Sequence, residues 1–305
     1  MRTLVTGGAG FIGSHIADAL LAQGHSVAVV DDLSTGTQKN LDPRIRFYNA
    51  DIRDQKTLAS ILAEVKPEVI SHQAAKASVR ESLEVPQLYA DVNIIGSINL
   101  LEQARRVGVR KIIYAGTGGA SYGNVNTLPV PETYPVNPLD PYGASKHTVE
   151  HYLYLYHHNY GLHYTILRYP NVYGPRQNPF GEAGVIAIFT YRMLKGEVPT
   201  LYGKGDKERD FCYVGDVANA NVLSLNQGDD QIYNIGSGVG TSINTIYEKL
   251  QKATGFEHPA NYAPDKPGEV YKIYLDASKA KRDLGWQPTI SLDDGLKWTV
   301  DSLRV

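Results

Sequence analysis

The sequence predicts an α/β fold in which a doubly wound parallel sheet is joined to a smaller, mixed α/β C-terminal lobe. Three observations predict it. A glycine-rich turn links the first apolar strand to a helix, strands and helices then alternate as far as Arg168, and shorter, less regular elements follow Pro170. Because parallel strands are joined by helical crossovers, this alternation covers both faces of a sheet with helices. We expect a first domain over residues 1–170 and a second lobe over 171–305, with some chain crossing back to the sheet.

The individual elements follow from apolar periodicity and from turn and helix-stop signals. Strands are expected at 2–6, 27–30, 45–48, 68–72, 110–115 and 164–168, and helices at about 14–22 and 55–65, in a long segment ending at Val107, and from Pro141 towards Tyr160. Further helices are expected near 185–195, 216–226 and 242–254, the last of which ends at Gly255. Ligands of such sheets bind beyond the carboxyl ends of the strands, so the residues that follow each strand are candidates for a site.

The first candidate site is the glycine-rich turn after the first strand. Gly8, Gly10 and Gly13 satisfy the pattern G-x-G-x-x-G between a strand and a helix. Small residues at these positions let a pyrophosphate approach the free amides at the helix N-terminus. The pattern predicts a dinucleotide site, and its members are Gly7, Gly10, Phe11, Ile12 and Gly13.

The second strand ends at two acidic residues that bear on the choice of dinucleotide. Asp31 stands where a carboxylate accepts hydrogen bonds from the adenosine ribose, and its charge repels a 2′-phosphate. This favours NAD over NADP. Asp32 either shares this role or is solvated.

A tyrosine and a lysine form the candidate catalytic pair. Tyr142 and Lys146 are four residues apart on an expected helix, so their side chains share one face. A free phenol titrates near pH 10, and a base that works near neutrality needs a pKa lowered by roughly three units, about 4 kcal/mol. A nearby ammonium supplies part of that stabilisation. Together with the glycine-rich turn, the pair predicts hydride chemistry.

Composition excludes several other classes of function. The net charge of −2 and the absence of long single-sign charge blocks argue against a nucleic-acid surface and against a polybasic membrane patch. Cys212 is the only cysteine, which excludes intrachain disulfides and thiolate metal clusters. No apolar run approaches the roughly 20 residues that span a bilayer. Because the chain passes from Met1 straight into a strand without a signal peptide, we expect a cytoplasmic protein.

The histidines suggest a metal site but do not predict one. His147 and His151 are four apart on the catalytic helix, and His157 and His158 lie further along it. A metal site requires a third ligand and an ordered second shell, and the sequence pattern supplies neither. We therefore expect no metal.

Three motifs together resemble the extended short-chain dehydrogenase/reductase family, over essentially the whole chain. They are the turn 7–13, Tyr142-Gly143-Ala144-Ser145-Lys146, and Arg209-Asp210-Phe211-Cys212-Tyr213-Val214-Gly215-Asp216-Val217. Within that family the chain looks like the UDP-glucose 4-epimerase branch. The resemblance implies a Rossmann fold, bound NAD, a UDP-sugar substrate, interconversion of UDP-glucose and UDP-galactose with N-acetyl forms as further substrates, and a homodimer formed by the helices that end near Val107 and Tyr160. Burial of the latter helix against the C-terminal lobe explains its apolar face equally well.

The resemblance also implies residue roles. Tyr142 is the base, Lys146 is its pKa-lowering partner and a ribose ligand, and Thr117 bridges Tyr142 to the sugar O4. The residues implied to hold NAD, besides the turn and the catalytic pair, are Asp31, Asp32, Asp51, Ile52, Gln73, Ala74, Ala75, Lys76, Asn93 and Tyr169. The residues implied to hold the UDP-sugar, besides Thr117 and Tyr142, are Asn171, Gly184, Val185, Tyr202, Arg209, Lys266, Glu269 and Ile273.

The chain departs from the family pattern at two places. Counting back from Tyr122, the usual catalytic serine falls on Gly118, which has no hydroxyl. Thr117 resembles the Thr-Gly-Gly variant of some epimerases, and Ser121 is the weaker substitute. At the second place Lys266 and Glu269 stand where an arginine and an aspartate are usual, which preserves the charges but not the bidentate geometry.

Three other functions share parts of this sequence pattern. A nucleotide-sugar 4,6-dehydratase needs an acid and a base just after the catalytic hydroxyl, where this chain has Gly118 and Gly119. A non-catalytic NAD sensor has no need of Thr117, Tyr142 and Lys146 together. Epimerases that act on UDP-glucuronate or UDP-pentoses stay open.

Overall fold

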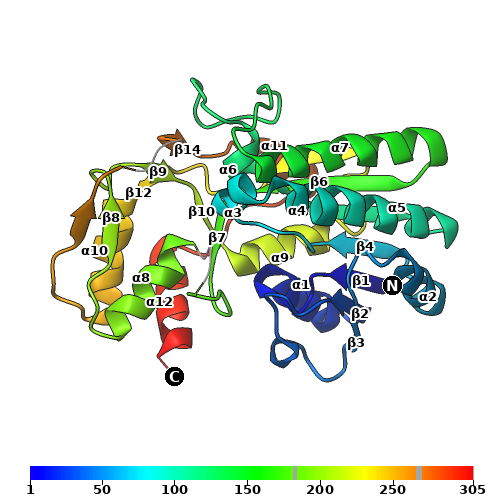
Figure 1. Cartoon of the computed structure of the whole chain (residues 1–305), viewed down its shortest axis with the longest axis horizontal. Coiled ribbons are helices and arrows are strands. Elements are labelled where there is room, and N and C mark those ends of the chain that lie inside the picture. Colours follow the sequence, from blue (N-terminus) through cyan, green and yellow to red (C-terminus); the bar gives the residue numbers. More distant parts are fainter. Residues whose placement is uncertain (181–183, 266–269, 305) are drawn as a thin grey trace.

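The structure is a computed structural model that describes residues 1–180, 184–265 and 270–304. The predicted ligands Lys266 and Glu269 lie outside the described residues. Figure 1 shows a large sheet covered by helices on the right and a smaller, mainly helical lobe on the left.

The large part contains a parallel sheet of seven strands in the order β11-β6-β5-β4-β1-β2-β3. Its members are β1 (Arg2–Thr6), β2 (Ser26–Asp31), β3 (Arg46–Asn49), β4 (Val69–His72), β5 (Lys111–Thr117), β6 (His163–Tyr169) and β11 (Gln231–Asn234). The strand order reverses between β1 and β4, which is where doubly wound sheets bind their ligands. The predicted fold class is confirmed. The last strand, β11, comes from the C-terminal half and pairs with β6.

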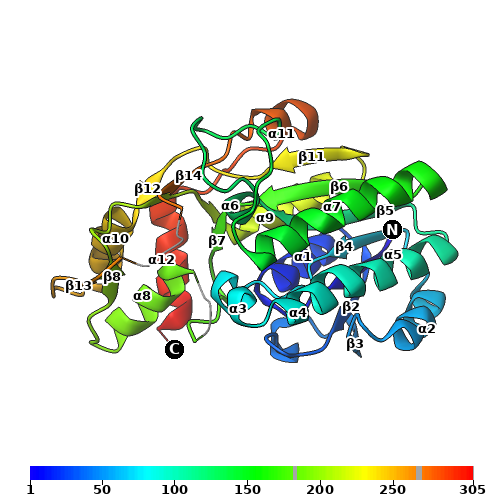
Figure 2. The ribbon, with the colours of Figure 1, turned by 45° about the horizontal axis from the view of Figure 1, so that its top comes forward.

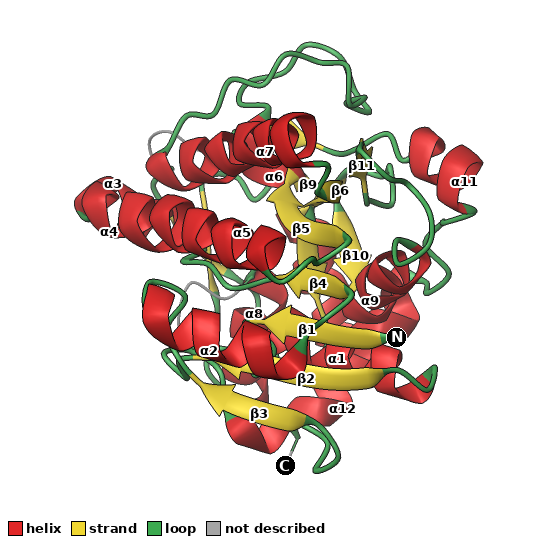
Figure 3. Cartoon of the chain, turned by 90° about the vertical axis from the view of Figure 1, so that its right-hand side faces the viewer, coloured by secondary structure: helices red, strands yellow, loops and turns green. Residues whose placement is uncertain are grey.

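Helices cover both faces of the sheet, as Figure 3 shows. On one face α1 (Phe11–Ala22) packs beside α9 (Val214–Leu223). On the other face α5 (Gly96–Arg106) lies between α2 (Gln55–Val65) and α7 (Pro141–Tyr160). Each face has its own buried apolar cluster. Because β5 is covered on both sides, all seven of its residues are buried.

The long helix predicted to end at Val107 is divided. It consists of α3 (Val79–Glu84), α4 (Pro86–Tyr89), a π-helical segment (Ala90–Ile95) and α5. Pro86 lacks an N–H and restricts the residue before it, so α3 stops and α4 begins with Pro86 as its first residue. Helix α1 starts earlier than expected, at Phe11, and α9 spans Val214–Leu223 rather than 216–226, while most other boundaries differ by one or two residues.

The smaller lobe is built on α8 (Val185–Leu194), α10 (Ile243–Thr254) and α12 (Leu292–Leu303), which surround a third apolar cluster. As predicted, α10 ends at Gly255, whose φ of +77° is left-handed. Short strands connect this lobe to the sheet: β7 (Asn171–Tyr173) with β10 (Phe211–Tyr213), β8 (Thr200–Tyr202) with β13 (Asn261–Ala263), and β9 (Glu208–Arg209) between β12 (Thr241–Ser242) and β14 (Lys272–Ile273). The short helix α11 (Ser278–Leu284) packs near β11.

No helix among the described residues combines the length and the apolarity that crossing a bilayer requires.

Candidate active site

The catalytic helix α7 presents Tyr142 in its first turn and Lys146 one turn later. The Asp140 carboxylate caps the helix by accepting a hydrogen bond of 2.7 Å from the Gly143 amide, and Pro141 opens the first turn. These local signals fix where the helix starts. They therefore also fix where the phenol and the ammonium project.

Thr117 lies against Tyr142 at the carboxyl end of β5. Its hydroxyl accepts the amide of Ala120 at 3.2 Å, which caps the single-turn helix α6 (Gly118–Ser121), and it lowers the pKa of the Tyr142 phenol. The predicted hydroxyl and phenol are thus brought together. Ser121, the weaker candidate, is fully buried, and its hydroxyl has no hydrogen-bond partner among the described residues.

The position of the usual serine is closed by packing. A Cβ atom on Gly118 would lie 2.9 Å from Cδ2 of Leu275 and closer still to Cδ1. A Cβ on Gly119 would meet nothing nearer than the Asn171 side-chain oxygen at 3.8 Å. Thr117 therefore supplies the candidate hydroxyl at this turn, and Asn171 lies beside Gly119.

The electrostatics of the pair differ from the sequence-based expectation. Burial raises the pKa of Tyr142 to about 12, and the Thr117 hydroxyl offsets only part of this. Burial also lowers the pKa of Lys146 to about 7, while Glu150 acts in the opposite direction. The Lys146 Nζ lies 4.4 Å from the centre of the Tyr114 ring. The expected lowering of the phenol pKa by Lys146 is not seen, because helical spacing predicted proximity but not the desolvation of both groups.

The glycine-rich turn has the shape of a cradle for a phosphate. Gly7 is left-handed, with φ of +66°, and a Cβ there would lie 2.7 Å from the Ala74 amide nitrogen. A Cβ on Gly13 would lie 2.8 Å from the Gly7 carbonyl carbon. Helix α1 begins after Gly10 without a side-chain cap, so its first amides are available to an anion. The turn, with Phe11 and Ile12 in the first turn of α1, therefore fits a dinucleotide pyrophosphate.

The Asp31 side chain is hydrogen-bonded to the backbone of the glycine-rich turn. Its carboxylate accepts hydrogen bonds from the amides of Ala9 at 3.0 Å and Leu33 at 2.8 Å, and burial raises its pKa. Asp32 is exposed and accepts a bond from the Ser34 amide at 2.9 Å. Asp31 thus shapes the turn as well as standing at the end of β2.

Asn93 joins the loop after β4 to the catalytic helix. Its side chain accepts a bond from the Lys76 amide at 2.8 Å and donates to the Lys76 carbonyl at 3.0 Å and to the Ser145 hydroxyl at 2.9 Å. The π-helical segment that carries Asn93 is a local departure typical of functional sites. Two predicted cofactor residues, Ala74 and Ala75, belong to the same loop.

The other predicted cofactor residues also follow strand ends. Tyr169 ends β6, accepts a bond from Asn221 at 2.8 Å and donates to Gln73 at 3.5 Å. Asp51 is ion-paired to Arg53 at 2.6 Å, which lowers its pKa. Ile52 is buried beside Gly96 of α5. All these residues lie at the carboxyl edge of the sheet.

The predicted substrate residues lie across from this edge on the small lobe. Arg209 in β9 pairs through its backbone with Ile273 in β14, and its guanidinium donates to the carbonyls of Glu208 at 2.9 Å and Tyr271 at 3.2 Å. Ile273 is only 3% exposed and packs in a cluster with Tyr122 and Leu275. Gly184 precedes α8, Val185 opens it, and Tyr202, which ends β8, is 40% exposed.

Sequence reasoning missed two groups of positioning residues. Asp210 is buried and accepts bonds from the amides of Ser237, Gly238 and Leu275 at 2.8, 3.2 and 3.1 Å, which joins the loop after β11 to the strand region that carries Ile273. The second group is the buried ion pair of Glu150 with Arg168, whose guanidinium also donates to the Tyr122 hydroxyl at 2.9 Å. The only local signal was a charged residue inside an otherwise apolar stretch.

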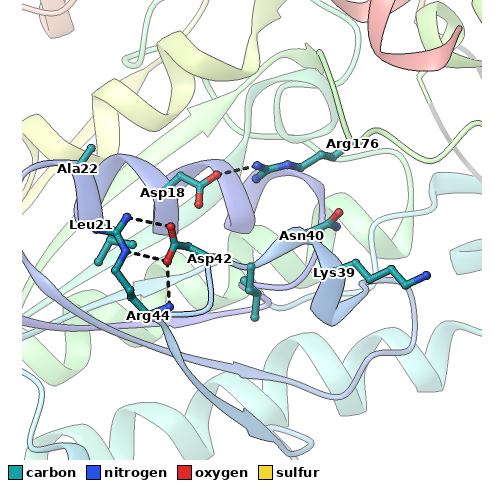
Figure 4. Close-up of a pocket in the computed structure, with 9 residues that line it drawn as sticks. Asp18, Leu21, Ala22, Lys39, Asn40, Asp42, Arg44 and Arg176 are labelled. Carbon is teal, nitrogen blue, oxygen red and sulfur yellow. Dashed lines mark hydrogen bonds and ion pairs between the residues drawn. The ribbon is translucent and has the colours of Figure 1, made fainter. Parts of the chain in front are cut away.

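A separate cavity of about 370 Å³ lies beside α1 and contains none of the predicted site residues. In Figure 4, Arg176 is directed to Asp18 at 2.8 Å and Arg44 to Asp42 at 2.8 Å, whereas the Lys39 side chain points away from them. Because both carboxylates are held in ion pairs, the described residues of the cavity show no arrangement of catalytic groups.

Comparisons with known proteins agree with this geometry. The chain is similar to the solved UDP-glucose 4-epimerase of Thermotoga maritima with UDP-glucose, at 48% identity and a TM-score of 0.98 over 100% of this chain and 99% of that chain. It is similar to the Thermus thermophilus UDP-glucose 4-epimerase in complex with NAD, at 45% identity and a TM-score of 0.95 over 100% and 99%. The UDP-glucose 4-epimerase of Mycolicibacterium smegmatis is 43% identical over 310 residues, which cover 100% of this chain and 99% of that protein.

The match to a protein family covers the strands of the large parallel sheet. Residues 3–236 match the NAD dependent epimerase/dehydratase family, from the first strand of the sheet through β11. The resemblance deduced from the three sequence motifs is confirmed. Since the match includes both the glycine-rich turn and the helix of Tyr142 and Lys146, this chain belongs to the NAD-dependent epimerase/dehydratase family.

Proposed function

We propose that this protein is a UDP-sugar 4-epimerase that carries NAD and interconverts UDP-glucose and UDP-galactose. The observation that carries the proposal is that the turn beginning at Thr117 packs against the first turn of α7, which holds Tyr142: a Cβ on Gly143 would lie 2.6 Å from the Ala120 carbonyl oxygen. Full-length similarity to UDP-glucose 4-epimerases supports the choice of substrate.

In this mechanism the residues of the chain move the proton of the sugar hydroxyl. NAD⁺, when bound, supplies the hydride acceptor for C4 of the sugar. Tyr142 acts as the base, and Thr117 relays to it the proton of the 4-hydroxyl. Because burial raises the pKa of the phenol to about 12, positive charge must approach it. Lys146 supplies this charge by a rotamer change that brings Nζ from the Tyr114 ring towards the phenol.

Inversion requires one half of the substrate to be held and the other to turn. Arg209 offers a guanidinium fork that matches phosphate oxygens, and Asn171 lies beside the Thr-Gly-Gly turn. We propose that these residues, with Gly184, Val185 and Tyr202, hold the UDP half. The 4-keto sugar then rotates and receives hydride on its opposite face. The cofactor is regenerated in each cycle and therefore stays bound.

On the cofactor side we propose that the turn 7–13 holds the pyrophosphate and Asp31 the adenosine ribose. The residues proposed to complete the NAD site at the carboxyl edge of the sheet are Asp51, Ile52, Gln73, Ala74, Ala75, Lys76, Asn93, Lys146 and Tyr169. We further propose that residues 1–170 form the cofactor domain and 171–305 the substrate lobe.

The test is a proton NMR assay of purified protein with UDP-galactose, UDP-N-acetylgalactosamine and UDP-galacturonate, without added cofactor. We expect the C4 epimer of UDP-galactose at an equilibrium ratio. If only UDP-galacturonate were epimerised, the proposed substrate would be wrong, but the proposed type of reaction would stand. A 4-keto-6-deoxy product, or no epimer even with NAD added, would overturn the proposal.

We also propose that the protein forms a homodimer through α5 and α7 and acts in the cytoplasm. Three large side chains on the outer face of α7 are exposed, namely Tyr154, Leu155 and Tyr160, and the Arg105 guanidinium of α5 lies 4.6 Å from the Tyr160 ring centre. Adjacent apolar faces of two helices can pair across a two-fold axis. Light scattering should give twice the chain mass, and Leu155→Glu should give the mass of one chain.

A further inference from the structure

Three metal-ligating side chains meet at the end of α7 that lies away from Tyr142. His157 lies in the last turn of α7, His163 is the first residue of β6, and Asp230 immediately precedes β11. In Figure 2 these chain ends lie on the right, where α7 finishes and the two strands begin. At 1.5 Å per residue, the helix separates His157 from Tyr142 by about 22 Å. The cluster is therefore distinct from the active site.

The donor atoms have spacings close to those of a coordination shell. The His163 Nδ1 lies 2.8 Å from one Asp230 carboxylate oxygen, and the His157 Nδ1 lies 3.1 Å from the other. All three ligand atoms lie within 4.8 Å of one another. Tetrahedral zinc with bonds of about 2.0–2.2 Å holds its donors roughly 3.3–3.5 Å apart. Small rotations of the side chains would complete such a shell.

The contact of His157 with Asp230 is not a hydrogen bond. The His157 Nδ1 is buried and has no hydrogen-bond partner among the described residues, although the carboxylate oxygen is 3.1 Å away. A cation placed between this nitrogen and the carboxylate would bind both atoms. It would give the buried His157 nitrogen the partner that it lacks among the described residues.

The rest of the cluster is ordered and open to a cation. Asp230 adopts a left-handed backbone with φ of +60°, its amide donates to the Tyr164 carbonyl at 2.6 Å, and its carboxylate accepts the Tyr164 amide at 3.2 Å. The side chains of His157, His163 and Asp230 are 32%, 39% and 26% exposed, so water can reach a further coordination position.

The buried ammonium of Lys111 is paired with a different carboxylate. Its Nζ lies 2.6 Å from Asp229 and donates to the Gln227 carbonyl at 2.5 Å. The ion pairs of Asp230 are with His157 and His163. Two imidazoles and one carboxylate suit zinc better than magnesium or calcium, which prefer oxygen ligands.

We propose that His157, His163 and Asp230 bind a divalent transition-metal ion, with zinc as the best match and water as the fourth ligand. The ion joins three segments that are separate in sequence: the end of the catalytic helix, the start of β6 and the start of the edge strand β11. Its effect is to hold α7 on the sheet from the end opposite Tyr142. A ligand that binds only the folded chain stabilises it in proportion to the logarithm of its concentration.

The test is zinc binding by untagged full-length protein, measured by competition with a chromophoric chelator. His147 and His151 form a second histidine pair at 3.2 Å on the same helix, so every variant is made in a His151→Gln background. We expect this background protein to bind one zinc. His163→Gln and, separately, the isosteric Asp230→Asn should each weaken that binding by at least about ten-fold.

Two further readouts address geometry and stability. Cobalt(II) added to the background protein should give the intense visible absorption of a four-coordinate site, and zinc should raise the midpoint of thermal unfolding. Both effects should vanish in His163→Gln and Asp230→Asn, with circular dichroism showing that the variants remain folded. Zinc affinity that is unchanged in both variants, or no zinc binding by the background protein, would overturn the proposal.

Discussion

The side chain of Leu275 occupies the space that a side chain at Gly118 would need. A Cβ atom on Gly118 would lie 2.9 Å from Cδ2 and 3.2 Å from Cγ of Leu275, well inside ordinary contact distance. Leu275 is itself fully buried, and its amide donates to the Asp210 carboxylate at 3.1 Å. The absence of a serine side chain at position 118 and the presence of Leu275 are therefore coupled, because Leu275 fills the space that a side chain at 118 would need.

Gly118→Ser should accordingly destabilise the protein and reduce turnover. Overpacking of a well-packed site costs about 1–3 kcal/mol. The matched control is Gly119→Ser, where the nearest atom to a new Cβ is 3.8 Å away and the loss should be much smaller. Urea unfolding of both variants measures the difference.

A double-mutant cycle tests the pairing itself. Leu275→Ala alone should cost about 2–5 kcal/mol through the cavity that it leaves. Gly118→Ser with Leu275→Ala should cost less than the sum of the two single changes, because the new side chain fills part of that cavity. Strict additivity would show that the two positions do not compete for space.

Thr117→Val should remove most of the turnover and leave NAD bound. The valine keeps the shape of the side chain but loses the hydroxyl that lowers the pKa of Tyr142, and a positioned proton relay contributes about 10²–10⁴-fold. Because Thr117 also caps α6, a stability loss of about 1 kcal/mol is expected as well. Thr117→Ser should retain activity. A near wild-type kcat for Thr117→Val, together with a loss in Ser121→Ala, would transfer the role to Ser121.

The free energy of unfolding should rise with pH because of Lys146. Burial lowers its folded-state pKa to about 7, whereas a lysine in an unfolded chain titrates near 10.4. Between those values the unfolded chain binds more protons, so the penalty for burying a charged lysine is largest below about pH 7 and fades as pH rises.

Urea unfolding at about pH 7.5 and about pH 9.5 should show a smaller rise in the free energy of unfolding in Lys146→Met than in the wild type. The exposed Lys297, changed to Met, is the control and should leave the rise intact. Equal rises in the wild type and Lys146→Met would refute the linkage.

Glu150→Gln should be strongly destabilising. Its carboxylate accepts two bonds from the Arg168 guanidinium, at 2.9 and 2.5 Å, and both side chains are almost fully buried. Removing one partner of a buried pair costs about 3–5 kcal/mol. Asp301→Asn, which breaks the exposed pair of Asp301 with Lys297, should cost no more than about 0.5 kcal/mol.

The buried pair also permits an internal check. Glu150→Leu combined with Arg168→Met removes both charges and should recover much of the stability that either single change loses. If the double variant lost as much stability as the two single variants together, the shape of the two side chains, rather than their charges, would be what stabilises this region.

Ile273→Tyr should selectively reduce turnover of UDP-N-acetyl sugars. Ile273 is smaller than a tyrosine, and the resemblance to the family places it near the sugar, so a larger side chain should exclude the N-acetyl group. Because Ile273 is buried beside Leu275, the variant should also lose about 1–3 kcal/mol of stability. The measurement is the ratio of kcat/KM values for UDP-galactose and UDP-N-acetylgalactosamine. An equal loss on both substrates would count against a role in selectivity.

The parts of the site that the sequence predicted are those coded by short-range patterns. The turn 7–13 and the pair Tyr142–Lys146 each fall within one turn of structure, where spacing alone determines which groups are neighbours. Counting back from Tyr122 leads to Gly118, and Thr117 is proposed instead because the chain resembles the Thr-Gly-Gly variant. The strand ends were located because apolar runs reveal parallel strands.

The parts that could not be predicted depend on partners far away in the chain. The Asn93 side chain bonds to Ser145, 52 residues later, and Leu275 closes Gly118 from the C-terminal lobe. Burial of Tyr142 and Lys146 moves their pKa values in directions that helical spacing cannot reveal. Likewise, the sequence did not reveal that His157 lies beside His163 and Asp230, because Asp230 is 73 residues beyond His157.

The seventh strand of the sheet makes the N-terminal part of the chain dependent on what is synthesised later. Until β11 has emerged from the ribosome, β6 presents an open edge of unpaired backbone groups, although every residue of the proposed cofactor domain already exists. Such edges recruit strands from other chains. A nascent chain that stalls before Gln231 should therefore be the most aggregation-prone state of this protein, and chaperone binding should end once Asn234 can pair.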